Sequence, residues 1–200
     1  MSNYNIVSDV GEALVRLLRE GMVPDIIPNP EGIGVCHPSD KGDVNLGIWL
    51  YDVRRNPDID TTERIAVGND KLRSPSIFLD LYYMVTAYSM SDIKFRTLEE
   101  AKIIGRTIQL IEGNPILKPE LYGKPFSEIR YVPRIEMLDF DHEEKHRIWN
   151  IPDMPYKLSV FYKVYPIEIQ SERITNITRV SETEFTFGQM QDRKDTREKE

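Results

Sequence analysis

The residues best suited to chemistry are two histidines, His142 and His146, with Glu143 between them. On a helix, a His-Glu-x-x-His spacing places both imidazoles on one face as zinc ligands and supplies a carboxylate as general base. A protease helix would carry this pattern in its middle, between apolar residues. Here it lies at the start of a short predicted helix, between the charged residues Asp141 and Lys145, and no further histidine follows it. We interpret it as an exposed charged helix, with a zinc-dependent hydrolase as the less favoured alternative.

A second candidate is the pair Cys36 and His37, because a thiol beside an imidazole can act as a nucleophile. Neighbouring residues of a strand point to opposite faces, so the strand predicted here would separate the two side chains. We therefore interpret Cys36 as a small, buried or half-buried thiol. The nearby segment Gly32-Ile33-Gly34 lacks the rest of a phosphate-binding fingerprint.

Three acidic residues, Asp58, Asp60 and Glu63, could suggest calcium. Their spacing does not match an EF-hand loop, and the glycine of its turn is missing, so solvated loop charge is the favoured interpretation. We assign no catalytic, cofactor-binding or metal-binding residue and no cofactor. The sequence favours a structural subunit that assembles with other chains over an enzyme.

The composition is that of an ordinary soluble domain, with 40% hydrophobic and 30% charged residues among 200. A net charge of −7 argues against a nucleic-acid partner, which would favour a basic face. The single cysteine excludes an intrachain disulfide and fits a reducing compartment. There is no secretory signal pattern and no apolar run near the ~20 residues of a membrane span. We expect synthesis and folding in the cytoplasm.

The candidate residues must be positioned by helices that the periodicity predicts at three places. The first is 9–20, with Asp9 or Ser8 as N-cap and Gly21 as the stop. The second is 96–112, with Leu98, Ala101, Ile104, Ile108 and Ile111 on one stripe. The third begins at Asp141 as N-cap, with a glutamate at N3 and a buried end at Ile148 and Trp149. A short turn of helix is also predicted within 116–122.

Alternating apolar residues predict strands near 33–36 and over 44–53, 77–88, 129–138 and 156–169. Pro133 predicts an edge strand or a bulge. Residues 56–75 are polar and are predicted to form a long surface loop. Together these elements predict an α+β domain over residues 1–170, in which helices pack on a mainly antiparallel sheet.

Residues 171–200 differ in character from the rest of the chain. Their few apolar residues are widely spaced, and 189–200 is almost wholly polar. Such a segment cannot bury enough apolar surface to order itself alone. We predict either a flexible tail or an arm that folds onto a partner.

The strands are also rich in aromatic residues, which are enriched both in cores and at protein interfaces. For the aromatic residues of these strands, the sequence favours core packing and intersubunit contact equally. These residues are Trp49, Tyr51, Tyr82, Tyr83, Tyr88, Tyr156, Phe161, Tyr162 and Tyr165.

Several segments taken together resemble one known family. They are Ser8-Asp9-Val10-Gly11-Glu12-Ala13-Leu14, Leu46-Gly47-Ile48-Trp49-Leu50-Tyr51-Asp52-Val53 before Asn56-Pro57, the strand from Leu79 to Tyr88, Ile104-Gly105-Arg106, His146-Arg147-Ile148-Trp149, and Tyr156 to Tyr162. In order and spacing they are similar to the Pvc16 N-terminal domain family, the cap or tail terminator proteins of phage-tail-like contractile injection systems. The resemblance covers roughly residues 6–170.

The resemblance implies a tail-terminator-like fold and a homo-oligomer, a hexameric ring that ends the inner tube and fixes the last layer of the sheath. It carries over no catalytic residue. The expected partners are further copies of the chain, the inner tube protein and the sheath protein, within the assembled particle. Another tail component, such as a neck or baseplate adaptor, is the main alternative. The expected docking regions are the strand edges, the 54–75 loop and the C-terminal segment.

Overall fold

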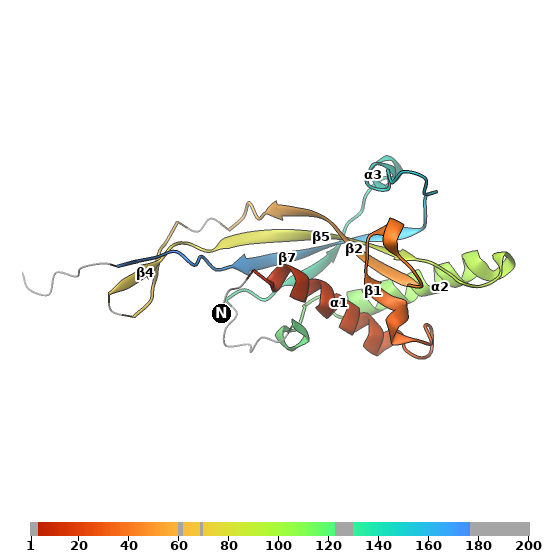
Figure 1. The fold of residues 1–200 in the computed structure, drawn as a ribbon, viewed down its shortest axis with the longest axis horizontal. Helices are drawn as coiled ribbons and strands as arrows, with labels where there is room; N and C mark the ends of the chain where they lie inside the picture. Colours follow the sequence, from red (N-terminus) through yellow and green to blue (C-terminus); the bar gives the residue numbers. More distant parts are fainter. Residues whose placement is uncertain (1–3, 60–61, 69, 123–129, 177–200) are drawn as a thin grey trace, which may run out of the picture.

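The computed structural model describes residues 4–59, 62–68, 70–122 and 130–176 (Figure 1). Within them the helices are α1 (Ile6–Met22), α2 (Ile93–Glu112) and α3 (His142–Ile148), with the 3-10 turns η1 (Pro30–Gly32), η2 (Pro38–Asp40) and η3 (Pro119–Tyr122). The strands are β1 (Ile33–Val35), β2 (Leu46–Arg55), β3 (Ile65–Ala66), β4 (Lys71–Arg73), β5 (Ile77–Ala87), β6 (Arg134–Met137), β7 (Ser159–Ile169) and β8 (Ile174–Asn176). The predicted turn at 116–122 is confirmed by η3.

A five-stranded sheet in the order β1-β2-β5-β7-β6 forms the body of the molecule. Only the β1–β2 pair is parallel, and the other three pairs are antiparallel. This arrangement confirms the predicted α+β class. Pro133 directly precedes β6, which lies at an edge of the sheet as predicted, because proline cannot donate a ladder hydrogen bond.

Helices α1 and α2 cover one face of this sheet and close the main core (Figure 1). Val10 and Leu18 of α1 are fully buried with Ile48 of β2 and Leu81 of β5. Burying a side chain of this size stabilises the fold by about 1.5–3 kcal/mol, so this apolar stripe holds α1 on the sheet.

The predicted start of the first helix is wrong by one turn. The N-cap is Asn5, without a side-chain cap bond, while Asp9 lies inside the helix and the Ser8 hydroxyl donates to the Asn5 carbonyl at 2.7 Å. Ile6 is buried in the core, and its burial favours one further helical turn over a side-chain cap at residue 8 or 9.

The predicted stripe of the second helix is only partly correct. Ile104 and Ile111 are buried, but Leu98 is exposed, and Glu100 is buried in its place. The C-terminal half of α2 packs on the body, whereas its N-terminal half projects beyond the sheet (Figure 1). Glu100 is drawn inward by Lys157, whose Nζ lies 3.0 Å from its carboxylate.

The second face of the sheet carries a smaller aromatic core. Met84, Trp149 and Phe161 are buried there, and partly buried side chains pack around them. Helix α3 lies on this side, away from α1 and α2 (Figure 1). Its predicted start is confirmed: Asp141 caps it, and Glu144 completes the capping box. The last long strand begins at Ser159, three residues later than predicted.

The predicted surface loop at 56–75 is partly wrong, because it contains strands β3 and β4. They pair with each other, and β8 pairs with β4, giving a three-stranded sheet in the order β3-β4-β8. We call this sheet the arm. It extends from one end of the long strands, at the opposite end of the molecule from the projecting half of α2 (Figure 1). Local sequence did not reveal it because β8 lies about a hundred residues from β4 and pairs only in the folded chain.

Candidate functional site

The His-Glu-x-x-His residues come together only in part. On α3 the two Nε2 atoms of His142 and His146 lie 3.1 Å apart. Glu143 instead binds Arg147 at 2.6 Å, and both of those side chains are exposed. The arrangement therefore lacks the free carboxylate beside the imidazoles that a metallohydrolase uses as its base.

Cys36 and His37 form no dyad. The His37 ring accepts a hydrogen bond at Nδ1 from the Ser39 backbone amide and packs edge-on against Trp49, with 4.7 Å between the ring centroids. Cys36 instead lies beside Gly47. Burial raises the pKa of the Cys36 thiol; Lys41 lowers it to a smaller extent, and Asp40 raises it further. A raised pKa keeps the sulfur protonated and therefore a poor nucleophile.

Asp58 and Glu63 lie in the described part of the 56–75 segment, and Asp60 lies outside it. Among the residues that the structure describes, no group of three or more histidine, cysteine, aspartate or glutamate side chains is gathered to hold a metal ion. The calcium alternative therefore has no geometric support in this part of the chain.

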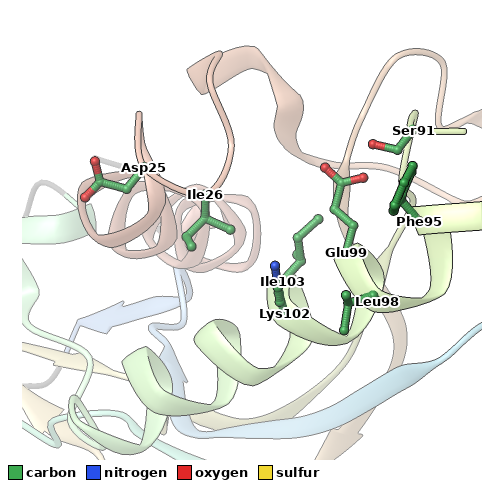
Figure 2. Close-up of a pocket in the computed structure, with 8 residues that line it drawn as sticks. All are labelled: Asp25, Ile26, Ser91, Phe95, Leu98, Glu99, Lys102 and Ile103. Carbon is green, nitrogen blue, oxygen red and sulfur yellow. The ribbon is translucent and has the colours of Figure 1, made fainter.

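A hollow of about 380 Å³ lies between the segment after α1 and the N-terminal half of α2 (Figure 2). Its wall is apolar at Ile26, Phe95, Leu98 and Ile103, and its polar lining comes from Asp25, Ser91, Glu99 and Lys102. Hydrogen bonds from Ser89 and Ser91 lower the pKa of Glu99, outweighing the small effect of burial. Glu99 is thus held ionised, which suits a charged rim and not a general acid.

Around this hollow, the N-terminal part of α2 exposes an unusual set of large apolar side chains. Ile93 is 80% exposed, Phe95 63% and Leu98 60%, and Met90 is exposed just before the helix. We call these four residues the α2 patch. Phe95 and Leu98 also line the hollow, and exposed large apolar side chains of this kind mark a candidate interaction site. The sequence prediction missed the α2 patch, because it began the helix at residue 96, three residues too late, and placed Leu98 on the buried stripe.

The arm is a second surface with interaction character. Its three strands are two or three residues long, β8 is exposed throughout, and both outer strands keep an unpaired edge within the described sheet. A sheet this small is marginally stable in water without packing on one face. Exposed strand edges are also templates for pairing with another chain.

A buried ion pair holds the sheet close to where the arm leaves the body. Asp80 of β5, 2% exposed, binds Lys163 Nζ of β7 at 2.9 Å and the Asn56 amide at 2.7 Å. The Asn56 side-chain oxygen, Oδ1, in turn accepts hydrogen bonds from the backbone amides of Asp58 and Ile59. Sequence reasoning missed this network, although a single acid in an apolar strand was its signal.

The aromatic residues divide between core and surface layers. Tyr83, Tyr88, Phe161 and Tyr162 are buried, and the other five are partly exposed: Trp49, Tyr51, Tyr82, Tyr156 and Tyr165. The partly exposed set lies mostly on the second face of the sheet, where Trp49, Tyr51 and Tyr82 follow one another at 6.2 Å between ring centroids.

Comparison with known proteins places the sequence in a defined context. The Pvc16 N-terminal domain family matches residues 9–183, past the boundary at residue 170 suggested by the sequence. No curated protein sequence matches the chain. No described helix is both long and apolar enough to cross a bilayer.

Two solved structures share the fold. One is the sheath/tube terminator, in the extended state, of an extracellular contractile injection system called PVC, with a TM-score of 0.67 and 18% identity. The other is the tube-terminating cap of the anti-feeding prophage, with a TM-score of 0.65 and 16% identity. The matches cover 92% and 90% of this chain, but 63% and 61% of those chains. This chain thus spans about three fifths of their length.

Proposed function

The chain belongs to the Pvc16 N-terminal domain family, and we propose that it is a structural cap subunit, a tail terminator that ends the inner tube and sheath of a contractile injection particle. The observation that carries this proposal is the shared fold: over nine tenths of the chain follows the fold of a sheath/tube terminator. A tube-terminating cap supports it with similar coverage.

The cap acts as a ring of identical subunits, for which we propose six copies as the family resemblance implies. A ring needs heterologous interfaces, in which one surface of a subunit meets a different surface of the next. The arm and the α2 patch suit this role because they lie at opposite ends of an elongated molecule (Figure 1). Subunits joined end to end in this way would bury both exposed surfaces.

The arm is the surface through which we propose that the chain pairs with a strand of a partner. Its outer strands β3 and β8 can each accept a further strand from a neighbouring copy, the tube protein or the sheath protein, the mode known as β-augmentation. Pairing would cover the exposed backbone edge and stabilise a sheet too small to be stable on its own. We propose that residues 171–200, which supply β8 of the arm, are an assembly segment distinct from the domain at 1–170.

The function is structural and not enzymatic. Two observations support a structural role over a hydrolase: Glu143 is paired with Arg147, and the pKa of the Cys36 thiol is raised. We propose that the chain is made in the cytoplasm and then becomes part of the particle.

Particles assembled without this chain test the proposal. Negative-stain images should show tubes and sheaths of uneven, excessive length, because nothing stops polymerisation at the distal end. Restoring the chain should restore a single length. The absence of particles, or particles of normal length that fail at the opposite end, would instead assign the chain to a neck or baseplate adaptor.

A truncation series tests the arm. Removing residues 171–200 deletes β8 and should leave a folded body that no longer caps, whereas removing only the polar residues 189–200 should leave capping intact. Circular dichroism checks folding, and tube length measures capping. Normal capping by the chain ending at residue 170 would contradict a role for the arm in assembly.

A further inference from the structure

The two histidines of α3 have a geometry that the proposed cap function does not use. Their Nε2 atoms face each other at 3.1 Å, and the ring planes meet at 85°. In a direct hydrogen bond one Nε2 must carry a proton, whereas a metal ion between them requires both to be unprotonated. The separation allows either state.

The distance fits chelation of one cation. With metal–nitrogen bonds of about 2.0–2.1 Å, nitrogens 3.1 Å apart subtend about 95–102° at the metal. This bite lies between the 90° of octahedral and the 109° of tetrahedral coordination.

Packing against neighbouring aromatic rings orients the two imidazoles. His146 stacks on Tyr156 at 4.7 Å between centroids and an interplanar angle of 30°. Tyr156 in turn packs against Trp149, which is buried and donates its indole N–H to the Pro155 carbonyl at 2.9 Å. The Asp141 capping box fixes the start of the helix. Both histidines are exposed to the solvent.

We propose that His142 and His146 form a two-point chelate for one divalent transition-metal cation of the borderline class, such as Ni²⁺, Cu²⁺ or Zn²⁺. Imidazole suits these cations, while Mg²⁺ and Ca²⁺ require oxygen ligands. Because the described residues offer no third histidine, cysteine or carboxylate at this place, the other coordination positions are open to water or to a donor from a partner. Glu143 pairs with Arg147, so we assign the site no hydrolytic base.

The test is calorimetric titration of the full chain with Ni²⁺, Zn²⁺, Co²⁺ and Mg²⁺ in turn, at neutral pH in a buffer that does not bind metals. We expect one cation per chain, with Ni²⁺ bound more tightly than Co²⁺ and no heat from Mg²⁺. Loss of a second-shell partner alone weakens a metal site about 10–100-fold. His142→Ala or His146→Ala removes a ligand itself and should therefore weaken binding at least tenfold.

The sequence offers a matched control, because His37 is the one histidine outside the pair. His37→Ala should leave the affinity unchanged. Circular dichroism verifies folding of each variant, and His142→Gln serves if His142→Ala loses α3. Absence of binding by the unaltered chain, binding that survives in His142→Ala and His146→Ala, or an equal loss in His37→Ala would each overturn the proposal. None of these results bears on tube length, so the cap function stands or falls separately.

Discussion

Replacing Lys163 with methionine is the sharpest test of how the sheet is held near the arm. The substitution keeps the length and apolar stem of the side chain and removes its charge. Asp80 would keep the bond from Asn56 but lose its cation, leaving a carboxylate that is 2% exposed without a counter-charge. Burial lowers the pKa of Lys163, but the hydrogen bond and charge of Asp80 outweigh this and raise it above its usual value.

The magnitude follows from the burial of the pair. Removing one partner of a buried ion pair costs about 3–5 kcal/mol, because the remaining charge is left uncompensated. The Lys163 side chain is 19% exposed, so water reaches it, and we expect a loss near the lower end, about 3 kcal/mol. For a chain of this size each kcal/mol lowers the Tm by about 2–4 °C, which gives a fall of about 6–12 °C.

Urea denaturation measures the free energy of unfolding for Lys163→Met, Asp80→Asn and the double variant. The double variant should be more stable than Lys163→Met alone, because it leaves no buried charge. The matched control is Arg147→Met, which breaks the largely exposed pair with Glu143 and should change stability by less than about 1 kcal/mol.

Two results would refute this reasoning. The first is a loss for Lys163→Met no larger than that of the exposed control. The second is a double variant whose loss equals the sum of the two single losses, since the two residues would then act independently.

Three further predictions concern other parts of the molecule. Gly47→Ala should lower the free energy of unfolding, measured by urea denaturation, by about 1–3 kcal/mol, because the added Cβ would lie 2.9 Å from the Cys36 sulfur. Adding Cys36→Ala should restore part of this free energy, and a double variant that restores none would contradict the assigned clash. Burial raises the pKa values of Tyr83 and Tyr162 above their ordinary value of about 10, so their contribution to stability is complete below about pH 10 and is lost as the pH rises further. The share of phenolate absorbance that Tyr83→Phe and Tyr162→Phe remove should therefore appear only with unfolding, and ionisation of these two residues in the folded chain near pH 10 would oppose this. Leu98→Ser should leave the free energy of unfolding within about 0.5 kcal/mol, because Leu98 is largely exposed, but should impair capping in the tube-length assay; normal capping would remove it from the interface.

Local periodicity predicted the elements whose burial it encodes directly. The strand over 77–88 and the helix at Asp141 are within a residue or two of their observed bounds, since alternation and capping chemistry act between near neighbours. The prediction failed where burial depends on distant packing. Leu98 fits the apolar stripe of α2 but is exposed, because the sheet ends before the helix does.

The candidate surfaces divide in the same way. The sequence identified His142 and His146 by their spacing, but only the folded chain brings their Nε2 atoms to 3.1 Å and turns Glu143 to Arg147. It also marked the 54–75 segment as a docking region without revealing the strands within it.

By itself, then, the sequence determined the α+β class, the long strands and the resemblance to a terminator family, because these depend on short-range patterns and on the order of segments. Tertiary structure alone decided the arm, the α2 patch and the buried pair of Asp80 with Lys163. Each of these joins residues far apart in the chain or depends on where the core ends. Their physical cause is the packing of one element against another, which no local window of residues contains.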